Sequence, residues 1–333
     1  MPNIVKAASM DAIYRGQAFG AVAQALMAHN MNPRGLRTND TLRKDEWKAL
    51  DEELVKIATL RLPVASGLIS RGLVYNINDG LGTTVLQYEK ESDMSAAELN
   101  MDATTTGAED RATYEIASLP LPVTHKSFRL NIRVLNASRK LGQAMDTTNV
   151  AIAMRKVAEL IEDVTVNGSG TFTYGGGSLY GMANFPSRNQ VTLAANWDDS
   201  ATTGAMILDD VIDMKQASLD DRHYGPWGLY VPTNYEAKLD EDFKANSDLT
   251  IRQRLEQVNN IEFVQVADKL TADNVLLVEL MPETMRMVVG LQPQVVEWES
   301  HGGLQSHFKV ISIMVPQPRA DKDGRCGIVH LAA

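Results

Sequence analysis

The longest helical pattern in the chain lies between residues 146 and 167. Apolar residues recur there at steps of three and four, and charged residues occupy the positions between them. This spacing places one apolar stripe along a helix of about six turns. Asp146 or Thr147 can cap its amino end and Gly168 can end it, so we expect this helix to be the scaffold of the fold. The stripe contains Val150, Ala153, Met154, Val157, Leu160, Ile161 and Val164, and the other faces carry Arg155, Lys156, Glu159, Glu162 and Asp163.

Two shorter amphipathic patterns lie near the amino terminus. An Ala-rich stretch covers residues 10–27, and a second helix is predicted for residues 42–60, after an Asn-Pro-Gly turn at residues 30–35. Two interpretations stay open: a helical subdomain that packs on its own body, or an arm that reaches a neighbouring subunit. The second helix has the apolar stripe Trp47, Leu50, Leu54, Ile57 and Ala58.

A long polar segment interrupts the β-rich region that follows. Residues 61–88 favour strands, and residues 128–134 alternate apolar and polar side chains, as a half-buried strand does. Between them, residues 89–115 contain eight acidic residues against Lys90 and Arg111. Compact domains seldom keep loops of this length without a use. The segment is therefore either a disordered loop or an extended hairpin whose strand edges pair with another molecule.

The second half of the chain alternates helices and strands. The Gly-rich residues 168–186 lack the Lys and the preceding strand of a phosphate loop, and are expected to cross between two lobes. An α+β lobe should follow, with the β structure beside the long helix completed by closing strands at residues 294–299, 308–316 and 327–331. The lobe is predicted to hold helices at residues 206–219 (with Ile207, Val211, Ile212 and Met214 inward), 235–243 and 249–258, and strands at residues 227–232, 261–266, 275–280 and 284–289.

Composition excludes several classes of protein. A chain of 333 residues with 44% hydrophobic and 22% charged residues can bury a sizeable core and form two lobes. No secretory signal or run of eighteen apolar residues is present, and Cys326 is the single cysteine, so a reducing cytoplasm is the expected place of synthesis. The net charge of −10 argues against a surface that grips nucleic acid everywhere, although a local basic face remains compatible with it.

No constellation in the sequence predicts catalysis, a cofactor or a metal. The hydrolase, zinc-protease and dinucleotide motifs are absent. His301 and His307 lie near Glu297 and Glu299, but a metal site there needs a third ligand, and turn histidines are the simpler interpretation. Cys326 is expected to be a small buried residue. The remaining carboxylate pairs and triplets are expected to form solvated faces: Asp209 and Asp210, Asp220 and Asp221, and Asp240, Glu241 and Asp242.

Taken in order, these parts resemble the shell proteins of the HK97 fold, close to the encapsulin-like group. The likeness is one of element order and short patterns along nearly the whole chain, and no single motif is very specific. The segments that carry it are Trp47–Asp51 with Leu54–Ala58 for the amino-terminal helix, Glu89–Glu115 for the extended E-loop, Asp146–Asn167 with Leu179–Met182 for the spine helix of the P-domain, and Leu229–Pro232 with Asn234 and Tyr235 for the A-domain.

The resemblance implies an α+β HK97-like capsid fold and a function in assembly, not in catalysis. The chain would be a major capsid protein that forms pentamers and hexamers of an icosahedral virion head around double-stranded DNA, assembled in the host bacterial cytoplasm. A decoration protein, portal or scaffold would be further partners, and no membrane is involved. The implied division is an amino-terminal arm (1–60), a β segment (61–135) with the E-loop (about 79–118), a P-domain spine and crossover (136–190), an A-domain (191–293) and closing P-domain strands (294–333).

Two other functions stay open. The first is an encapsulin-type compartment around a cargo enzyme, although this chain is longer than a typical encapsulin. The second is an α+β enzyme without a recognisable motif. Shells of the HK97 type include one that is cross-linked by a Lys–Asn isopeptide bond, and Lys90 lies on the polar segment here. Nothing identifies a partner asparagine, so no catalytic residue is carried over and a non-covalent shell is expected.

Overall fold

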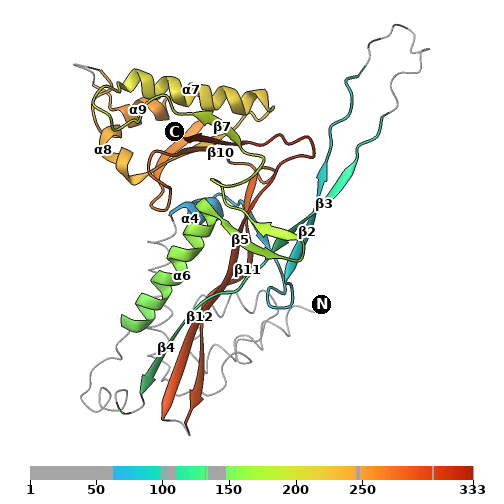
Figure 1. Ribbon diagram of the computed structural model, residues 1–333, viewed down its shortest axis with the longest axis vertical. Helices are drawn as coiled ribbons and strands as arrows, with labels where there is room; N and C mark the ends of the chain where they lie inside the picture. Colours follow the sequence, from blue (N-terminus) through green and yellow to red (C-terminus); the bar gives the residue numbers. More distant parts are fainter. Residues whose placement is uncertain are drawn as a thin grey trace, which may run out of the picture.

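Two sheets and one long helix organise the computed structural model, which describes residues 63–97, 99, 101, 110–131, 133, 148–244, 248–301 and 304–332. The helices predicted before residue 61 therefore lie outside the described residues. In Figure 1 the two sheets lie one above the other along the long axis of the molecule. The four-stranded sheet has the order β1 (Val74–Asn76), β11 (Met285–Ser300), β12 (Gln305–Pro318) and β4 (Thr124–Asn131), and the five-stranded sheet has the order β7 (Asn189–Thr192), β13 (Ile328–Ala332), β10 (Val275–Glu279), β8 (Trp227–Val231) and β9 (Ile261–Val266).

The spine helix α6 (Thr148–Asn167) packs along β4 and β12, as the apolar periodicity predicts. Gly168 ends it with a φ of 69°, and its N–H still donates to the carbonyl of Val164 at 3.0 Å. Leu160 is a wrong prediction, because 47% of it is exposed, whereas Ile161 beside it is buried. At Leu160 the predicted apolar stripe therefore includes a position that faces solvent and not the core. Glu162, predicted on a polar face, is only 2% exposed.

Helix α4 (Pro63–Ser70) replaces the strand that the β-rich composition of residues 61–88 predicted. Pro63 occupies the first helical position, where a missing N–H costs nothing. The N–H groups of Val64 and Ala65 donate to the Glu162 carboxylate at 2.8 and 3.2 Å. A side chain of α6 thus caps α4 from 97 residues away in sequence, which explains why local patterns did not reveal the helix.

The five-stranded sheet is buried on both faces. Alternate residues of its strands enter two different cores, one shared with α4 and α6 and one under α7 (Gly204–Asp220) and α9 (Ile251–Glu256). Figure 1 shows α7 lying across this sheet. Thr203 caps α7 through the N–H of Met206. Ile212, predicted inward, is 45% exposed, so the buried stripe of α7 is narrower than the sequence suggests.

The remaining predicted elements need four corrections. The helix predicted for residues 235–243 is a 3₁₀ turn η2 (Thr233–Tyr235) followed by α8 (Glu236–Leu239), and α9 is shorter than predicted. The strands predicted at 284–289 and 294–299 are one strand, β11, which continues through two register shifts between Val289 and Gln294. The closing strand β13 pairs with β7 and β10 in the five-stranded sheet and not beside α6.

None of the described helices combines the length and the apolar content that crossing a bilayer requires.

Candidate functional site

A hairpin projects from the body and carries the long acidic segment. Its strands β2 (Val85–Glu91) and β3 (Tyr114–Pro120) pair in antiparallel register and form a two-stranded sheet of their own. Figure 1 shows the pair extending away from both larger sheets. The predicted hairpin is therefore present, but its second strand is β3, while the alternating segment that starts near Phe128 is β4 of the four-stranded sheet.

The base of the hairpin is buried and its outer half is not. Leu86, Tyr88 and Leu119 pack into a core with Ile311 and Val288 of the four-stranded sheet. Further out, Ile116 is 66% and Tyr114 is 56% exposed. A large exposed apolar pair on an otherwise acidic hairpin is a feature of an interaction surface more than of a solvated loop.

The turn of a second hairpin supports this base. Strands β5 (Ser169–Tyr174) and β6 (Gly177–Leu179) pair with each other, and β6 lies against β3. The backbone of Gly177 approaches the carbonyl of Ser118 so closely that a Cβ would not fit. The predicted crossover at residues 168–186 thus wedges the projecting hairpin against the body.

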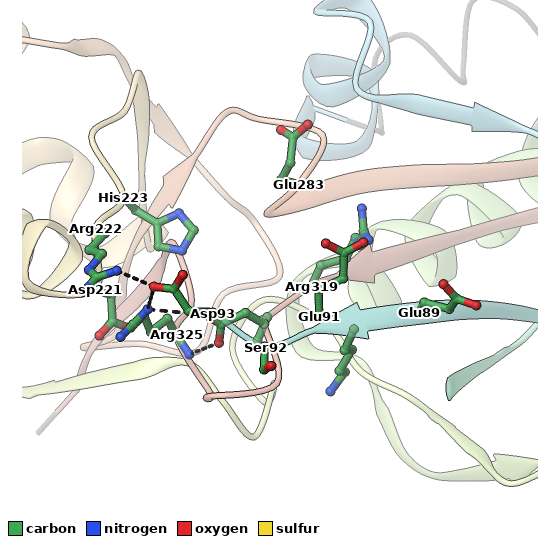
Figure 2. Close-up of a pocket in the computed structure, with 13 residues that line it drawn as sticks. Glu89, Glu91, Ser92, Asp93, Asp221, Arg222, His223, Glu283, Arg319 and Arg325 are labelled. Carbon is green, nitrogen blue, oxygen red and sulfur yellow. Dashed lines mark hydrogen bonds and ion pairs between the residues drawn. The ribbon is translucent and has the colours of Figure 1, made fainter. Parts of the chain in front are cut away.

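A charged cavity of about 510 Å³ lies where the end of β2 faces the five-stranded sheet. Figure 2 shows its side chains, which come from β2, the α7–β8 loop, the β10–β11 loop and the β12–β13 loop. Their types are mostly acids and arginines, without a grouping of a nucleophile and a base. The lining residues are Glu89, Lys90, Glu91, Ser92, Asp93, Asp221, Arg222, His223, Glu283, Arg319, Ala320, Asp321 and Arg325.

Ion pairs at Asp93 tie the hairpin to the lobe of the five-stranded sheet. The Asp93 carboxylate accepts from Arg222 at 2.5 Å and from Arg325 at 3.2 Å, an arrangement that we call the charged junction. The backbone N–H of Met94 and the two guanidinium groups lower the pKa of Asp93. Lys322 adds two contacts, from its N–H to the carbonyl of Glu91 and from Nζ to the Thr113 hydroxyl at 2.7 Å.

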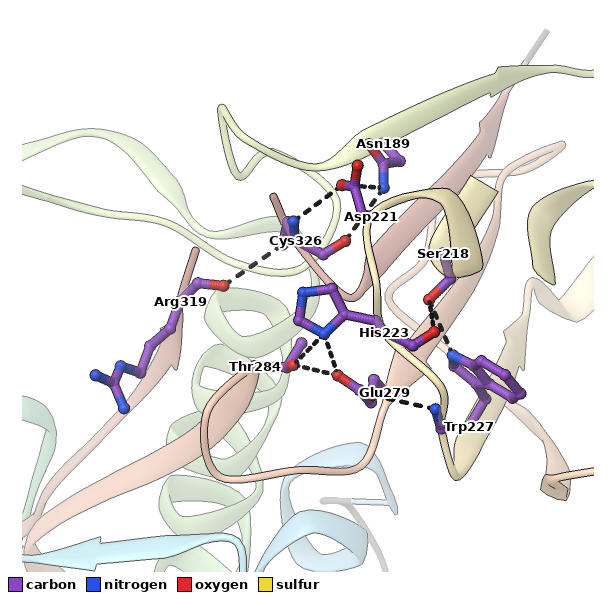
Figure 3. Close-up of polar contacts among 10 residues, drawn as sticks. Asn189, Ser218, Asp221, His223, Trp227, Glu279, Thr284, Arg319 and Cys326 are labelled. Atoms are coloured by element: carbon purple, nitrogen blue, oxygen red, sulfur yellow. Dashed lines mark hydrogen bonds and ion pairs between the residues drawn. The ribbon is translucent and has the colours of Figure 1, made fainter. Parts of the chain in front are cut away.

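At the wall of the cavity, the half-buried His223 forms a cluster with the buried residues Glu279 and Thr284 (Figure 3). His223 Nδ1 bonds the Glu279 carboxylate, which also accepts from the Thr284 hydroxyl at 2.6 Å and from the N–H of Gly225 at 3.1 Å. The bond to Glu279 raises the pKa of His223, although burial opposes it. Burial acts to raise the pKa of Glu279, but the bonds from His223 and Thr284 outweigh it and lower that pKa. The cluster braces the α7–β8 and β10–β11 loops against the end of β10. The Thr284 hydroxyl donates to the carboxylate and is therefore not a free nucleophile.

Two sequence candidates lie beside this cluster. Asp221, expected on a solvated face, accepts from Asn189 at 2.8 Å and from the N–H of Cys326 at 3.0 Å. Cys326 is fully buried, as expected, and burial raises the pKa of its thiol to about 12. A thiol in this state is unreactive at neutral pH. Asp221 and Cys326 therefore fix loop positions.

The histidine candidates meet a serine and an aromatic ring. His301 Nδ1 and His307 Nε2 both bond the Ser300 hydroxyl, at 2.9 and 2.7 Å. The His307 ring also stacks on Trp298, with centroids 5.3 Å apart. Glu297 and Glu299 lie on the alternate side of β11, facing away from these rings. Within the described residues, no three His, Cys, Asp or Glu side chains form a group that fits a metal ion.

Two of the remaining carboxylates also have structural partners. Asp210 accepts from the Trp197 indole at 2.8 Å, and Asp240 pairs with Arg252 at 3.2 Å. The expectation of a solvated face was too simple for Asp210, which is half-buried against the indole, whereas Asp240 is exposed as expected. The sequence did not single out Arg222, His223, Glu279 or Arg325, because they come from the α7–β8 loop, the end of β10 and the β12–β13 loop, which lie far apart in the chain.

Solved shell proteins share this arrangement of elements. The virus-like particle from Pyrococcus furiosus is 16% identical with a TM-score of 0.60, and the alignment covers 86% of this chain and 98% of that one. The capsid of Myoviridae phage XM1 is 12% identical with a TM-score of 0.59, covering 79% and 90%. The capsid of an empty GTA particle is 14% identical with a TM-score of 0.59, covering 94% and 99%.

These likenesses establish an HK97-like α+β capsid fold, as the sequence resemblance implied. No curated protein sequence matches the chain. A family model covers residues 38–331, which include all of the described residues but the last, and so the chain belongs to the family described as a family of unknown function (DUF6260).

Proposed function

We propose that this chain is a shell protein that assembles with copies of itself into a closed particle. The observation that carries the proposal is the projecting hairpin β2–β3. Its Tyr114 and Ile116 are exposed in the single subunit, and neither strand pairs with a third described strand. Free strand edges and exposed apolar side chains are the features through which one subunit binds another.

Closure of the particle multiplies contacts that are individually weak. Each subunit offers its hairpin to a neighbour and receives one in turn, a head-to-tail contact that closes into rings when the rotation fits. Pentamers and hexamers built this way share one sequence. When the particle closes, its contacts act together, and their combined strength exceeds that of any single contact. Catalysis plays no part in this function.

In this proposal, each strand is assigned to a domain according to the sheet in which it lies. Residues 1–60 form the arm, 61–135 the β segment with its E-loop at about 79–118, and 136–190 the spine helix and crossover. The A-domain covers 191–293 together with β13, because that strand lies between β7 and β10. Strand β12 and the part of β11 from residue 294 onward belong to the P-domain with α6.

A virion head around double-stranded DNA, assembled in a bacterial cytoplasm, is the particle that we favour. The net charge of −10 suits a wall that does not hold packaged DNA tightly. A portal, a scaffold or a decoration protein would be further partners. The second candidate is an encapsulin-type compartment, supported by the likeness to the virus-like particle from Pyrococcus furiosus. Terminase and portal genes beside this gene would favour the virion, and a gene for a cargo enzyme would favour the compartment.

Assembly is tested by expressing the full chain and examining it by sedimentation velocity and electron microscopy. We expect closed particles from the unmodified chain. Replacing residues 89–115 with a short Gly-Ser turn should leave the circular dichroism spectrum almost unchanged and abolish regular particles. A chain that stays monomeric at high concentration would refute the proposal.

A double substitution on the hairpin and a control substitution on the other lobe distinguish a specific role of the hairpin surface from a general effect of changing the protein surface. Tyr114→Ser with Ile116→Ser should leave the subunit folded and raise the concentration needed for assembly at least tenfold. Tyr224→Ser is the matched control, since Tyr224 is 64% exposed on a loop of the other lobe. Equal loss of assembly in both variants would mean that the hairpin has no special role.

A further inference from the structure

Two arginines lie at the end of the four-stranded sheet where β11 begins and β12 ends. Arg286 is on β11, and Arg319 follows directly after β12, where its N–H still donates to the carbonyl of Thr284 at 2.8 Å. Both arginine side chains are half-buried. Within the described part of the chain neither guanidinium forms an ion pair, although the chain has 42 acidic and 32 basic residues. Burial of a charge without a counter-charge costs free energy, so the two guanidiniums favour an anion at this place.

Each guanidinium lies against an aromatic ring. The Arg286 guanidinium is 4.5 Å from the centre of the Tyr75 ring, and the Arg319 guanidinium is 5.7 Å from the centre of the Tyr88 ring. A guanidinium stacked on a ring face keeps the N–H groups at its edge available as donors. The rings therefore position both arginines and leave most of their donors for a ligand.

The register of the strands places these groups on one side of the sheet. Arg286 pairs with Gln317 across β11 and β12, and Tyr75 pairs with Val288, two residues further along β11. Residues two apart in a strand point to the same side, and Val288 shares a core with Tyr88 at the base of the hairpin. Burial raises the pKa of Tyr88 and the two arginines oppose this rise, which places both of them near its hydroxyl. The sheet and the hairpin thus form two walls of one site.

A fully buried amide beside Arg286 has a donor without a partner. The Gln317 side chain is buried, and its Oε1 accepts from Arg286 Nε at 2.6 Å. Its Nε2 has no hydrogen-bond partner among the described residues. Such an unsatisfied donor is costly, and in native proteins it often marks a bound water or ion. Because both atoms belong to one planar amide, Nε2 also lies next to Arg286.

The site is reached through the charged cavity, because Arg319 lines that cavity (Figure 2). Glu91 and Glu283 line it too, but both are exposed and neither forms an ion pair with Arg319 within the described residues. Water and salt screen exposed carboxylates. An anion from solvent can therefore approach Arg319 through the cavity.

We propose that Arg286, Arg319 and the Gln317 amide bind a phosphate group that carries two negative charges, either a free phosphate ion or the terminal phosphate of a nucleotide. A guanidinium can donate two parallel hydrogen bonds to phosphate oxygens, so two guanidiniums suit a dianion. A carboxylate or an internal phosphate of a nucleic-acid strand carries one charge and would leave one arginine unpaired. The site lies within one subunit and does not depend on the proposed function.

Bound phosphate should hold the base of the hairpin against the sheet. Both arginines belong to the sheet side of the site, whereas Tyr88 belongs to β2. An anion that fixes Arg319 against the Tyr88 ring restrains β2. Because the unfolded chain has no such site, phosphate should also stabilise the folded chain by an amount that rises with its concentration.

The direct test is the binding of inorganic phosphate to the full chain, followed by the line width of its phosphorus NMR signal at constant ionic strength. We expect saturable binding at one site per chain. Arg286→Gln and Arg319→Gln should each weaken binding at least tenfold. Arg129→Gln is the matched control, because Arg129 is exposed on β4 and pairs with the other end of β12. It should change the dissociation constant less than twofold.

A carboxylate built into the site should replace the ligand. Gln317→Glu places a negative charge beside Arg286, so it should raise the melting temperature in phosphate-free buffer and weaken phosphate binding at least tenfold. In the unmodified chain, phosphate should raise the melting temperature more than chloride does at equal ionic strength, and Arg319→Gln should remove this difference. If Gln317→Glu does not fold, the two arginine variants decide the question.

Competition distinguishes the two sources of phosphate. A nucleoside monophosphate that binds more tightly than inorganic phosphate would assign the site to nucleotides, and one that binds more weakly would assign it to the free ion. Closed circular duplex DNA has no terminal phosphate and should not compete.

Three results would overturn the inference. They are the absence of saturable phosphate binding, an equal loss of binding in Arg129→Gln and Arg319→Gln, and competition by circular DNA that matches inorganic phosphate at equal phosphate concentration. None of these measurements scores particle formation, so the proposed function is tested separately.

Discussion

At the scale of single residues, two neighbouring residues of α6 mark the edge of its buried apolar stripe. Leu160 is 47% exposed and Ile161 is 1% exposed, although both fit the periodic pattern. Ile161→Asp should unfold the subunit, because it removes a buried side chain worth about 2 to 5 kcal/mol and adds a buried charge. Leu160→Asp should remain soluble, with a change of about 0.5 kcal/mol or less. Urea unfolding of both proteins compares them directly, and equal damage would place both side chains in the core.

Glu162 shows why a charged residue in a helical pattern need not face water. Its carboxylate replaces the missing cap of α4 and lies at the positive end of that helix. Burial nevertheless raises its pKa to about 7, since the N–H bonds from Val64 and Ala65 offset only part of the desolvation. No sequence pattern reports such a contact, because the helix it caps is distant in the chain.

The pH dependence of stability should follow from this carboxyl group. Its pKa is higher in the folded chain than the ordinary value of 4.5, so between pH 4.5 and 7 the folded state binds more protons than the unfolded state. The free energy of unfolding should therefore fall as pH rises through this window, by about 3 kcal/mol at most. Glu162→Gln should flatten the dependence of the melting temperature on pH between 5 and 7.5. An unchanged slope would show that other groups cause it.

At the scale of elements, the sequence predicted what local periodicity determines. The spine helix, the buried strand at Trp227 and the alternation near Phe128 each follow from repeats within one segment. Helix α4 and the partner of β13 were missed, because both depend on contacts between distant segments. The charged junction was missed for the same reason: Asp93, Arg222 and Arg325 share no spacing in the chain.

The charged junction should restrain the hairpin without adding much to global stability. Asp93 and its two arginines are partly exposed, and exposed ion pairs contribute little to global stability because water and salt screen them. Asp93→Asn should leave the melting temperature nearly unchanged but speed hydrogen exchange at the amides of β2 and β3. Adding Arg222→Gln should produce little further change, because the interaction is already lost. Unchanged exchange in Asp93→Asn would mean that the Gly177 turn alone holds the hairpin.

At the scale of the whole molecule, the proposed function lies in surfaces that one subunit cannot use. The sequence indicated the acidic segment but not the core under the base of its hairpin, because that core combines residues of β2, β3, β11 and β12 from distant parts of the chain.

The last prediction concerns whether the assembled shell is covalently cross-linked. An isopeptide bond needs a lysine and an asparagine from different subunits beside a carboxylate and away from water. Lys90 is half-buried and lines a cavity with six carboxylates, whereas nucleophilic lysines usually lie in apolar pockets. Mature particles boiled in denaturant should therefore give one band near 36.6 kDa on a denaturing gel. A ladder of multimers that persists with reducing agent and disappears in Lys90→Ala would show instead that this lysine reacts, and that the shell is stabilised by covalent bonds beyond the contacts described above.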